Sequence, residues 1–479
     1  MSAEPALTEL TVPALSLVVL IGAHGAGKST LAARHFAPEE VFAQADYPDV
    51  PSLLSAAGER LAAGRLAVLD GLFVRPVDRV PVTALARAHD VKPVPVVLDL
   101  PRAVLEARTA APADVVAAQV AELRRTRRGL HAEGFRNEQV LFSDEQAGTL
   151  PLRRTPLRGD RRDLTGPFDV IGDVHGCLPE LRDLLRDLGY DLSGGGARHP
   201  RGRTAVFVGD LVDRGPDSLG VLNLVMGMVA GGAALCVPGN HDEKLCRALA
   251  GKAVKAMHGL DVTLAQLEQA GPDVQAQVRT FIETLPTQLV LDGGALIVAH
   301  AGLPAHYHGR GGGRVRSFAL YGDVNGQRDE LGLPIRRDWA ADYHGAALVV
   351  YGHTPHAAPR WKGHTVNVDT GCAFGGHLSA LRYPERTTLS VPARAVYAPR
   401  PGPCPCRKGE WVVGSGQWVG LDGGGGVAHT LLTIHHPPST IHHPPSAIRH
   451  PPSAIRHPPS AIRHPPSAIR HHHQPRRLK

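Results

Sequence analysis

The sequence predicts an α/β protein in two parts, followed by a tail without a fold. Short apolar runs alternate with helical segments over residues 14–150, and the same alternation returns over residues 168–395. Such alternation is typical of strands connected by helices. Residues 396–479 are instead rich in proline, glycine and histidine. We therefore expect two α/β domains, joined by a charged linker at residues 151–167, and a disordered tail.

Length and composition argue against a membrane protein and a disulfide-rich one. The chain has 479 residues, and length alone allows about two to four domains. No apolar run approaches the roughly 20 residues that a membrane span needs. The opening MSAEPALTEL has no basic cluster of the kind found in secretory signals. Six cysteines in so long a chain do not indicate a disulfide framework. We expect a cytoplasmic protein with no membrane partner.

The positive charge of the chain belongs to its tail. Residues 399–479 carry ten Lys and Arg but two Asp and Glu, whereas the whole chain has a formal net charge of +7. The rest is nearly neutral, so the high pI does not indicate that the folded part binds nucleic acid.

The tail contains tandem heptapeptides such as RHPPSAI, which repeat from His435 to Ile469. Pro-Pro in each repeat excludes a coiled coil. Cys404 and Cys406 lack a second pair of ligands for zinc.

A phosphate-binding loop is predicted near the start of the first part. The runs at 15–21, 65–70 and 93–100 are expected to be buried strands, and KSTLAARHF at 28–36 a helix. Between the first strand and this helix, GAHGAGKST fits the P-loop pattern G-x-x-x-x-G-K followed by Ser or Thr. The predicted nucleotide-binding residues are Gly22, Gly25, Gly27, Lys28, Ser29 and Thr30.

That loop predicts binding of ATP and Mg²⁺. Backbone amides would surround the phosphates, Lys28 would reach the β and γ phosphates, and Ser29 would hold Mg²⁺. A kinase also needs a base, and Asp46 lies where a carboxylate could accept the proton of an attacking hydroxyl. Asp70 could support the metal or the substrate. An ordinary loop aspartate explains each of these two residues equally well.

Five polar clusters in the second part each follow a short apolar run. They are GDVHG at 172–176, GDLVDRG at 209–215, GNHD at 239–242, HAG at 300–302 and GHT at 352–354. If the runs are strands, the clusters gather at one edge of a sheet, where α/β proteins form their sites. A single Asp-X-His is more often a turn with a surface histidine, but five clusters in this order favour a metal site. The predicted ligands are Asp173, His175, Asp210, Asn240, His300 and His353.

These ligand types favour a pair of transition-metal ions. Mixed oxygen and nitrogen donors suit Mn, Fe or Zn better than Mg or Ca alone. Two such ions about 3.5–4 Å apart can share one carboxylate and hold a phosphate between them. Asp210 is the candidate for the shared carboxylate.

The order of the clusters resembles the calcineurin-like binuclear metallophosphoesterases over residues 168–395. The resemblance implies a two-layer β sandwich flanked by helices, which moves the expected fold of this part from α/β to α+β. It assigns Asp173, His175 and Asp210 to one ion and Asp210, Asn240, His300 and His353 to the other, with Mn, Ni, Fe or Zn as the metal. It also implies that Arg214 clamps the phosphate, that His241 protonates the leaving oxygen, and that Asp242 orients His241.

A P-loop followed by this phosphoesterase resembles the bacterial polynucleotide kinase-phosphatases (Pnkp). The join RTPLRGDRRDLTGPFDVIGDVHGC at 154–177 is similar to the linker of that family, and the likeness covers residues 14–395. It implies an ATP-dependent kinase of 5′-OH ends, with Asp46 as the base. The phosphatase would remove 3′-phosphate or 2′,3′-cyclic phosphate from nucleic-acid ends, RNA rather than DNA, in RNA repair. The resemblance also implies a methyltransferase and a separate ligase as partners, and a homodimer.

The chain departs from that family at three points. After Asp70 stand Leu72 and Phe73, where the family has polar residues. The alanine-rich segment at 106–120 replaces an arginine-rich lid and retains Arg108, so we expect an impaired kinase. Nothing after residue 395 could fold as the family's ligase domain. Two other hypotheses stay open: a protein Ser/Thr or dinucleoside-polyphosphate phosphatase with a nucleotide-binding regulatory domain, and an ATP-binding scaffold.

Overall fold

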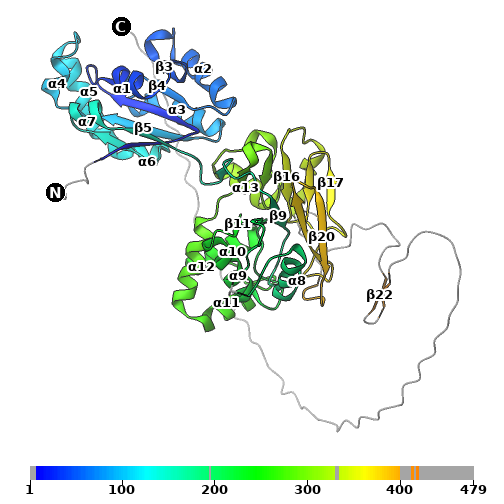
Figure 1. Ribbon diagram of the computed structural model, residues 1–479. Helices are drawn as coiled ribbons and strands as arrows, with labels where there is room; N and C mark the ends of the chain where they lie inside the picture. The colour runs from blue at the N-terminus through cyan, green and yellow to red at the C-terminus, as the bar shows by residue number, and fades with distance from the viewer. Residues whose placement is uncertain (1–6, 194–195, 329–333, 400–411, 415–416, 420–479) are drawn as a thin grey trace, which may run out of the picture. The chain divides into compact units, whose positions relative to one another are not determined.

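The computed structural model describes residues 7–193, 196–328, 334–399, 412–414 and 417–419 (Figure 1). The chain divides into two units, Met1–Cys406 and Arg407–Lys479. The predicted domain boundaries at residues 150 and 168 both lie in the first unit and stay a prediction. The heptapeptide repeats, Cys404 and Cys406 lie outside the described residues. In the second unit, β21 (Val412–Gly414) pairs antiparallel with β22 (Gln417–Val419).

The first part of the chain forms a five-stranded parallel sheet in the order β3-β4-β2-β5-β6. Its strands are β2 (Ser16–Gly22), β3 (Val41–Ala43), β4 (Ala67–Asp70), β5 (Lys92–Leu98) and β6 (Gln139–Leu141). The strands predicted at 15–21, 65–70 and 93–100 are confirmed as β2, β4 and β5. The strands β3 and β6 are not predicted, because three-residue strands are too short to show a periodic pattern.

Helices pack on both faces of this sheet. They are α1 (Lys28–His35), α2 (Val50–Ala62), α3 (Pro76–Ala88), α4 (Arg102–Glu106), α5 (Ala113–Thr126), α6 (Leu130–Glu133) and α7 (Asp144–Thr149). Successive residues of β2 alternate between two cores, since Val18 and Leu20 share one with α1 and α5, while Val19 and Ile21 share the other with α2 and α3. A strand buried on both faces is an unbroken apolar run, which is why β2 is clear from sequence.

The segment predicted as a linker contains two strands. Within residues 151–167, β7 (Leu152–Thr155) pairs in parallel with β1 (Leu10–Pro13). In the same segment, β8 (Asp160–Arg161) pairs with β12 (Leu289–Leu291). The partners lie far away in the sequence, so no local pattern predicts these strands.

The second part contains two stacked sheets, as the resemblance predicts. The five-stranded sheet has the order β11-β10-β9-β19-β20 and the six-stranded sheet β17-β18-β16-β13-β12-β8. The former contains β9 (Phe168–Ile171), β10 (Thr204–Phe207), β11 (Ala234–Cys236), β19 (His377–Tyr383) and β20 (Thr387–Pro392). The latter adds β13 (Leu296–Val298), β16 (Leu348–Tyr351), β17 (Arg360–Lys362) and β18 (Thr365–Asn367). Val170 and Val206 of one sheet share a buried core with Val298 and Val350 of the other, which confirms a two-layer β sandwich.

Helices cover the outer face of the five-stranded sheet (Figure 1). They are α8 (Leu178–Leu188), α9 (Ser218–Ala230), α10 (Asn240–Leu249), α11 (Leu260–Ala270) and α12 (Pro272–Thr284). On the chain between β13 and β16 lie α13 (Gly313–Tyr321) and a hairpin of β14 (Val324–Arg328) and β15 (Pro334–Arg336). Val396 forms a bridge with Phe374, so ordered chain continues past the predicted boundary at residue 395. Among the described residues, no helix is both long and apolar enough to cross a membrane.

Candidate metal centre

The five predicted clusters all follow strands of the sandwich. Asp173 follows β9, Asp210 follows β10, and Asn240 begins α10 after β11. These three strands are parallel neighbours in the five-stranded sheet. His300 follows β13 and His353 follows β16, which are parallel neighbours in the six-stranded sheet. The clusters therefore meet at one end of the sandwich, with both sheets contributing, and the expectation of a single sheet edge is corrected.

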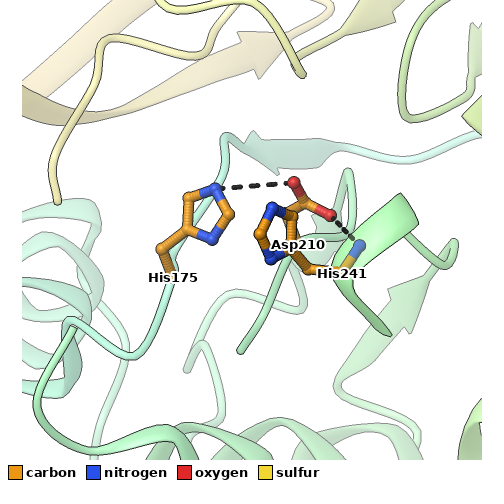
Figure 2. A group of neighbouring side chains, drawn as sticks. All are labelled: His175, Asp210 and His241. Carbon is orange, nitrogen blue, oxygen red and sulfur yellow. Dashed lines mark hydrogen bonds and ion pairs between the residues drawn. The ribbon is translucent and has the colours of Figure 1, made fainter. Parts of the chain in front are cut away.

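Asp210 lies at the middle of these side chains. Its Oδ2 is 3.4 Å from His175 Nε2 and 3.5 Å from His300 Nε2. Its Oδ1 accepts a hydrogen bond from the backbone N–H of His241 at 2.9 Å (Figure 2). Donor atoms fall into two groups within 4.8 Å, one of His175, Asp210 and His241 and one of Asp210, His300 and His353. Asp210 belongs to both groups, which is the position that a carboxylate shared by two ions requires.

The tautomer of His300 leaves the lone pair of its Nε2 facing an acceptor. His300 Nδ1 lies 3.1 Å from the Val208 carbonyl oxygen, so Nδ1 carries the hydrogen. Its Nε2 then points a lone pair at Asn240 Oδ1, 3.1 Å away, and lies 3.0 Å from His353 Nδ1. Facing acceptors of this kind repel each other unless a cation lies between them. The residues present therefore fit a divalent metal ion.

His175 has the same tautomer as His300. Its Nδ1 donates to the Val212 carbonyl oxygen at 2.9 Å, which leaves Nε2 directed toward Asp210. Metal-binding histidines commonly donate their other ring N–H in this way, because the bond fixes the tautomer and the ring orientation.

Burial sets the charge state of the centre. It lowers the pKa of His175, His300 and His353, which keeps these imidazoles neutral at neutral pH. Burial, together with the charges of Asp369 and Asp210, raises the pKa of Asp173. Burial also opposes ionisation of Asp210, but its surroundings, which include the positive charge of Arg214, hold its pKa below the usual range. Neutral imidazoles around an ionised carboxylate are ready to bind a metal ion, because no ligand nitrogen has to lose a proton first.

Asp173 and Asn240 complete the predicted ligand set. Asp173 accepts the backbone N–H of His353, with its Oδ2 at 3.0 Å, and so joins the two sheets beside the centre. Asn240 reaches the same centre through its contact with His300. The structure thus brings all six predicted ligands together, and their metal binding stays a prediction.

The backbone is strained at this centre. Five non-glycine residues have φ in the left-handed region: His175 (47°), Asp210 (48°), Arg214 (68°), Asp213 (70°) and His353 (73°). Each such residue costs about 1–3 kcal/mol and persists where the surrounding structure enforces it. This concentration of strained residues is typical of a functional site.

Two glycines let the backbone approach the carboxylates. A Cβ at Gly239 would lie 2.1 Å from Asp210 Oδ1, and one at Gly352 would lie 1.9 Å from Asp173 Oδ1. Any side chain at either position would displace a predicted ligand. Close approach therefore explains why glycine flanks these motifs.

Arg214 extends from the same strand end as Asp210 toward the histidines. Its guanidinium contacts His175 Nε2, and its Nη2 lies 3.1 Å from His241 Nε2. The guanidinium also stacks over the ring of Phe374, 4.9 Å from the centroid. Arg214 is half-buried beside the centre, and its role as a phosphate clamp stays a prediction.

The residue that orients His241 is Asp213, not Asp242 as predicted. His241 Nδ1 lies 2.8 Å from Asp213 Oδ2. Asp242 instead accepts the backbone N–H groups of Leu211 at 3.0 Å and Gly239 at 2.8 Å. Adjacent side chains on a helix diverge, so the neighbour of His241 is badly placed to bind it. The second aspartate of GDLVDRG is the signal in the sequence that could identify this partner.

The predicted phosphate-binding loop connects β2 to α1 as expected. Lys28 Nζ donates to the carbonyl oxygens of Gly22 and Ala23, each at 3.0 Å. The Ser29 hydroxyl donates to Asp70 Oδ2 at 2.6 Å. Because β4 and β2 are neighbouring parallel strands, Asp70 at the end of β4 lies beside the loop. Nucleotide binding by this loop stays a prediction.

The other residues predicted for the kinase are less closely grouped. Gly25 and Gly27 have φ of 77° and 80°, as a tight loop requires, and Thr30 is exposed in the first turn of α1. Asp46 is exposed at the end of a short turn after β3. Arg108 is exposed and forms two hydrogen bonds of 2.6 Å with Asp144 at the start of α7.

Residues 166–357 match the calcineurin-like phosphoesterase family. The chain is 48% identical over 234 residues to the asymmetrical bis(5′-nucleosyl)-tetraphosphatase PrpE of Anoxybacillus flavithermus, which covers 48% of this chain and 96% of that protein. The protein of the same name from Bacillus subtilis shows the same identity and coverage. A crystal structure of a candidate diadenosine tetraphosphatase is 30% identical, with a TM-score of 0.37, and covers 49% of this chain and 96% of that chain.

The chain belongs to the calcineurin-like phosphoesterase family. It is a metal-dependent phosphoesterase, and members of this family bind two divalent ions, for which the structure offers groups of His and Asp side chains. The predicted resemblance to polynucleotide kinase-phosphatases is supported for the phosphoesterase part alone. The relatives carry the name of dinucleoside tetraphosphatases, which matches an alternative hypothesis rather than the leading one.

Proposed function

We propose that this protein hydrolyses dinucleoside tetraphosphates asymmetrically, to a nucleoside triphosphate and a nucleoside monophosphate. The observation that carries the proposal is the pair of donor groups sharing Asp210, with Arg214 beside both. The PrpE relatives support the choice of substrate, because nearly their whole length aligns with this chain at 48% identity.

The chain supplies binding and proton transfer around the ions. Two divalent ions, when bound, polarise a phosphate group and activate a water for attack on phosphorus. The guanidinium of Arg214 pairs with phosphate oxygens and neutralises charge that grows on them. His241 protonates the oxygen of the departing phosphate, and Asp213 holds the ring so that Nε2 faces Arg214, 3.1 Å from its Nη2.

A hollow beside Arg214 suits a nucleoside. It has a volume of about 540 Å³ and is lined in part by Arg214, His258, Phe374 and Tyr397. Aromatic rings and an arginine offer stacking surfaces to a purine base. Replacing the exposed His258 by alanine should raise KM for the dinucleotide about threefold or more. The same variant should turn over p-nitrophenyl phosphate, which has no base, like the unaltered protein.

The main test compares three substrates under one condition. Full-length protein with Mn²⁺ should convert bis(5′-adenosyl) tetraphosphate to ATP and AMP in equal amounts, measured by ion-exchange chromatography. Asp210→Ala should abolish the reaction, because it removes the side chain common to both donor groups. Oligonucleotides ending in 3′-phosphate or 2′,3′-cyclic phosphate serve as the competing substrates. Release of phosphate from these, with the dinucleotide left intact, would establish RNA end-healing instead, a hypothesis that rests on the Pnkp resemblance.

A second candidate function concerns the phosphate-binding loop. We propose that it binds a nucleoside triphosphate with Mg²⁺, because the Ser29–Asp70 bond and the Lys28 position bring a cation ligand and a phosphate ligand to one strand edge. Lys28→Met should weaken ATP binding about tenfold or more in calorimetry. Arg34→Met, at an exposed position of the same helix, is the matched control. Transfer of label from ATP to a 5′-OH oligonucleotide would extend the function to a kinase.

A further inference from the structure

A further cluster of side chains of the types that bind metals lies outside the proposed catalytic centre. Cys177, Glu180 and Cys372 are buried, and their sulfur and carboxylate oxygen atoms lie within 4.8 Å of one another. Cys177 precedes α8, Glu180 lies in its first turn, and Cys372 lies in the loop between β18 and β19. The proposed catalysis uses none of the three.

The Glu180 carboxylate is only partly satisfied by the residues that the structure describes. The side chain is fully buried, with 0% exposure. Oε1 accepts the Tyr397 hydroxyl at 2.7 Å and the Arg394 backbone N–H at 2.8 Å. Oε2 is buried and has no hydrogen-bond partner among the residues that the structure describes. A buried carboxylate oxygen without a donor or cation is costly, so this oxygen is available as a ligand while Oε1 is held in place.

The two thiols supply the other ligands. The sulfur atoms of Cys177 and Cys372 lie within 4.8 Å of each other. The neighbouring Cys177 thiol, together with burial, raises the pKa of Cys372. The Cys372 thiol therefore stays protonated until a thiophilic cation replaces its proton. The thiol of Cys177 otherwise has a long contact of 3.6 Å with the His175 carbonyl oxygen.

We propose that Cys177, Glu180 and Cys372 form a further metal site, which takes a thiophilic divalent cation such as Zn²⁺. Binding forms two metal–sulfur bonds and one metal–oxygen bond, and releases two thiol protons to solvent. The Tyr397 and Arg394 bonds to Oε1 orient the carboxylate. Cys177 is two residues beyond His175, so the cation ties the loop carrying a catalytic ligand to the loop of Cys372.

Cobalt tests this site separately from the catalytic centre. Co²⁺ bound by thiolates has an intense sulfur-to-metal charge-transfer band, whereas the predicted catalytic ligands are nitrogen and oxygen atoms. All proteins carry Cys404→Ser and Cys406→Ser, so that no tail thiol contributes. We expect the band in this background and in Cys246→Ser, which removes another buried cysteine. Cys372→Ser should lose it.

Glu180→Gln gives a second and milder test. It keeps both thiols and the size of the side chain, and should weaken Co²⁺ binding about tenfold or more while the band remains inducible at high Co²⁺. If Cys372→Ser does not fold, as judged by circular dichroism, Glu180→Gln decides the question. Absence of the band in the background protein, an unchanged band in Cys372→Ser, unchanged affinity in Glu180→Gln, or a Cys177–Cys372 disulfide found by thiol titration would each overturn the proposal.

Discussion

His241 Nδ1 lies 2.8 Å from Asp213 Oδ2, and both side chains are buried. The other oxygen of Asp213 accepts the Thr263 hydroxyl at 2.8 Å, which fixes the carboxylate. The imidazole is therefore held by a residue of the β10 loop, with Nε2 facing Arg214. This pair gives His241 a single orientation toward the position that we assign to the phosphate.

Asp213→Asn should lower kcat on bis(5′-adenosyl) tetraphosphate about 100-fold and leave KM nearly unchanged. An amide can donate to Nδ1, which places the ring hydrogen on the wrong nitrogen for proton transfer. Thr263→Val removes the hydrogen bond from the Thr263 hydroxyl to Asp213 but keeps the His241 contact. It should therefore lower kcat less than about tenfold. Steady-state kinetics of the two variants checks this, and equal losses in both would contradict the role of Asp213.

The sharing of Asp210 predicts unequal metal losses. Asp210→Asn should remove about two bound Mn²⁺ ions per chain and Asn240→Ala about one, because Asp210 alone belongs to both donor groups. Metal content after desalting is measured by plasma mass spectrometry. The histidine-rich tail is the same in all samples, so metal bound to it does not change the difference in metal content between variants. A loss of one ion in each variant would contradict a shared ligand.

Asp242 should matter for stability rather than for orienting His241. Burial and the charge of Asp210 raise its pKa to about 8, while its oxygens accept two backbone N–H groups. Asp242→Asn places an amide NH₂ against one of these donors, and should lower the free energy of unfolding by about 1–3 kcal/mol. Urea unfolding measures the change. Asp187→Asn, on the exposed side of α8, should stay within about 0.5 kcal/mol.

His199 should make the protein acid-sensitive. Its Nδ1 accepts the Arg201 backbone N–H at 3.1 Å, and burial lowers its pKa. The unfolded chain therefore binds more protons than the folded one once the pH falls below about 6.5, so stability is lost on acidification. When the pH falls from about 7.5 to about 5.5, the free energy of unfolding of the native protein should decrease by roughly 1 kcal/mol more than that of His199→Phe.

Urea unfolding at the two pH values provides the measurement for His199. The exposed His377 gives the control, since His377→Phe should leave the pH dependence of the native protein unchanged. If the native protein and His199→Phe lose equal stability on acidification, the neutral state of His199 does not contribute to the pH dependence of the free energy of unfolding.

Much of the fold can be predicted because buried parallel strands leave a local pattern. β2, β4 and β5 are mostly apolar runs, and the clusters containing Asp173, Asp210 and His300 stand directly after such runs. The P-loop pattern is equally local. Strands such as β7 and β8 escape prediction because their pairing partners lie far away in the chain.

The sequence by itself determined which side chains could hold metal, since the ligand types and their position after strands are local properties. Tertiary structure alone decided that two sheets share the centre and that Asp213 rather than Asp242 holds His241. It also brought Cys372 to Cys177 and Glu180. The physical reason is that these contacts join segments distant in the chain, and their geometry follows from how the sheets, loops and helices pack rather than from any spacing in sequence.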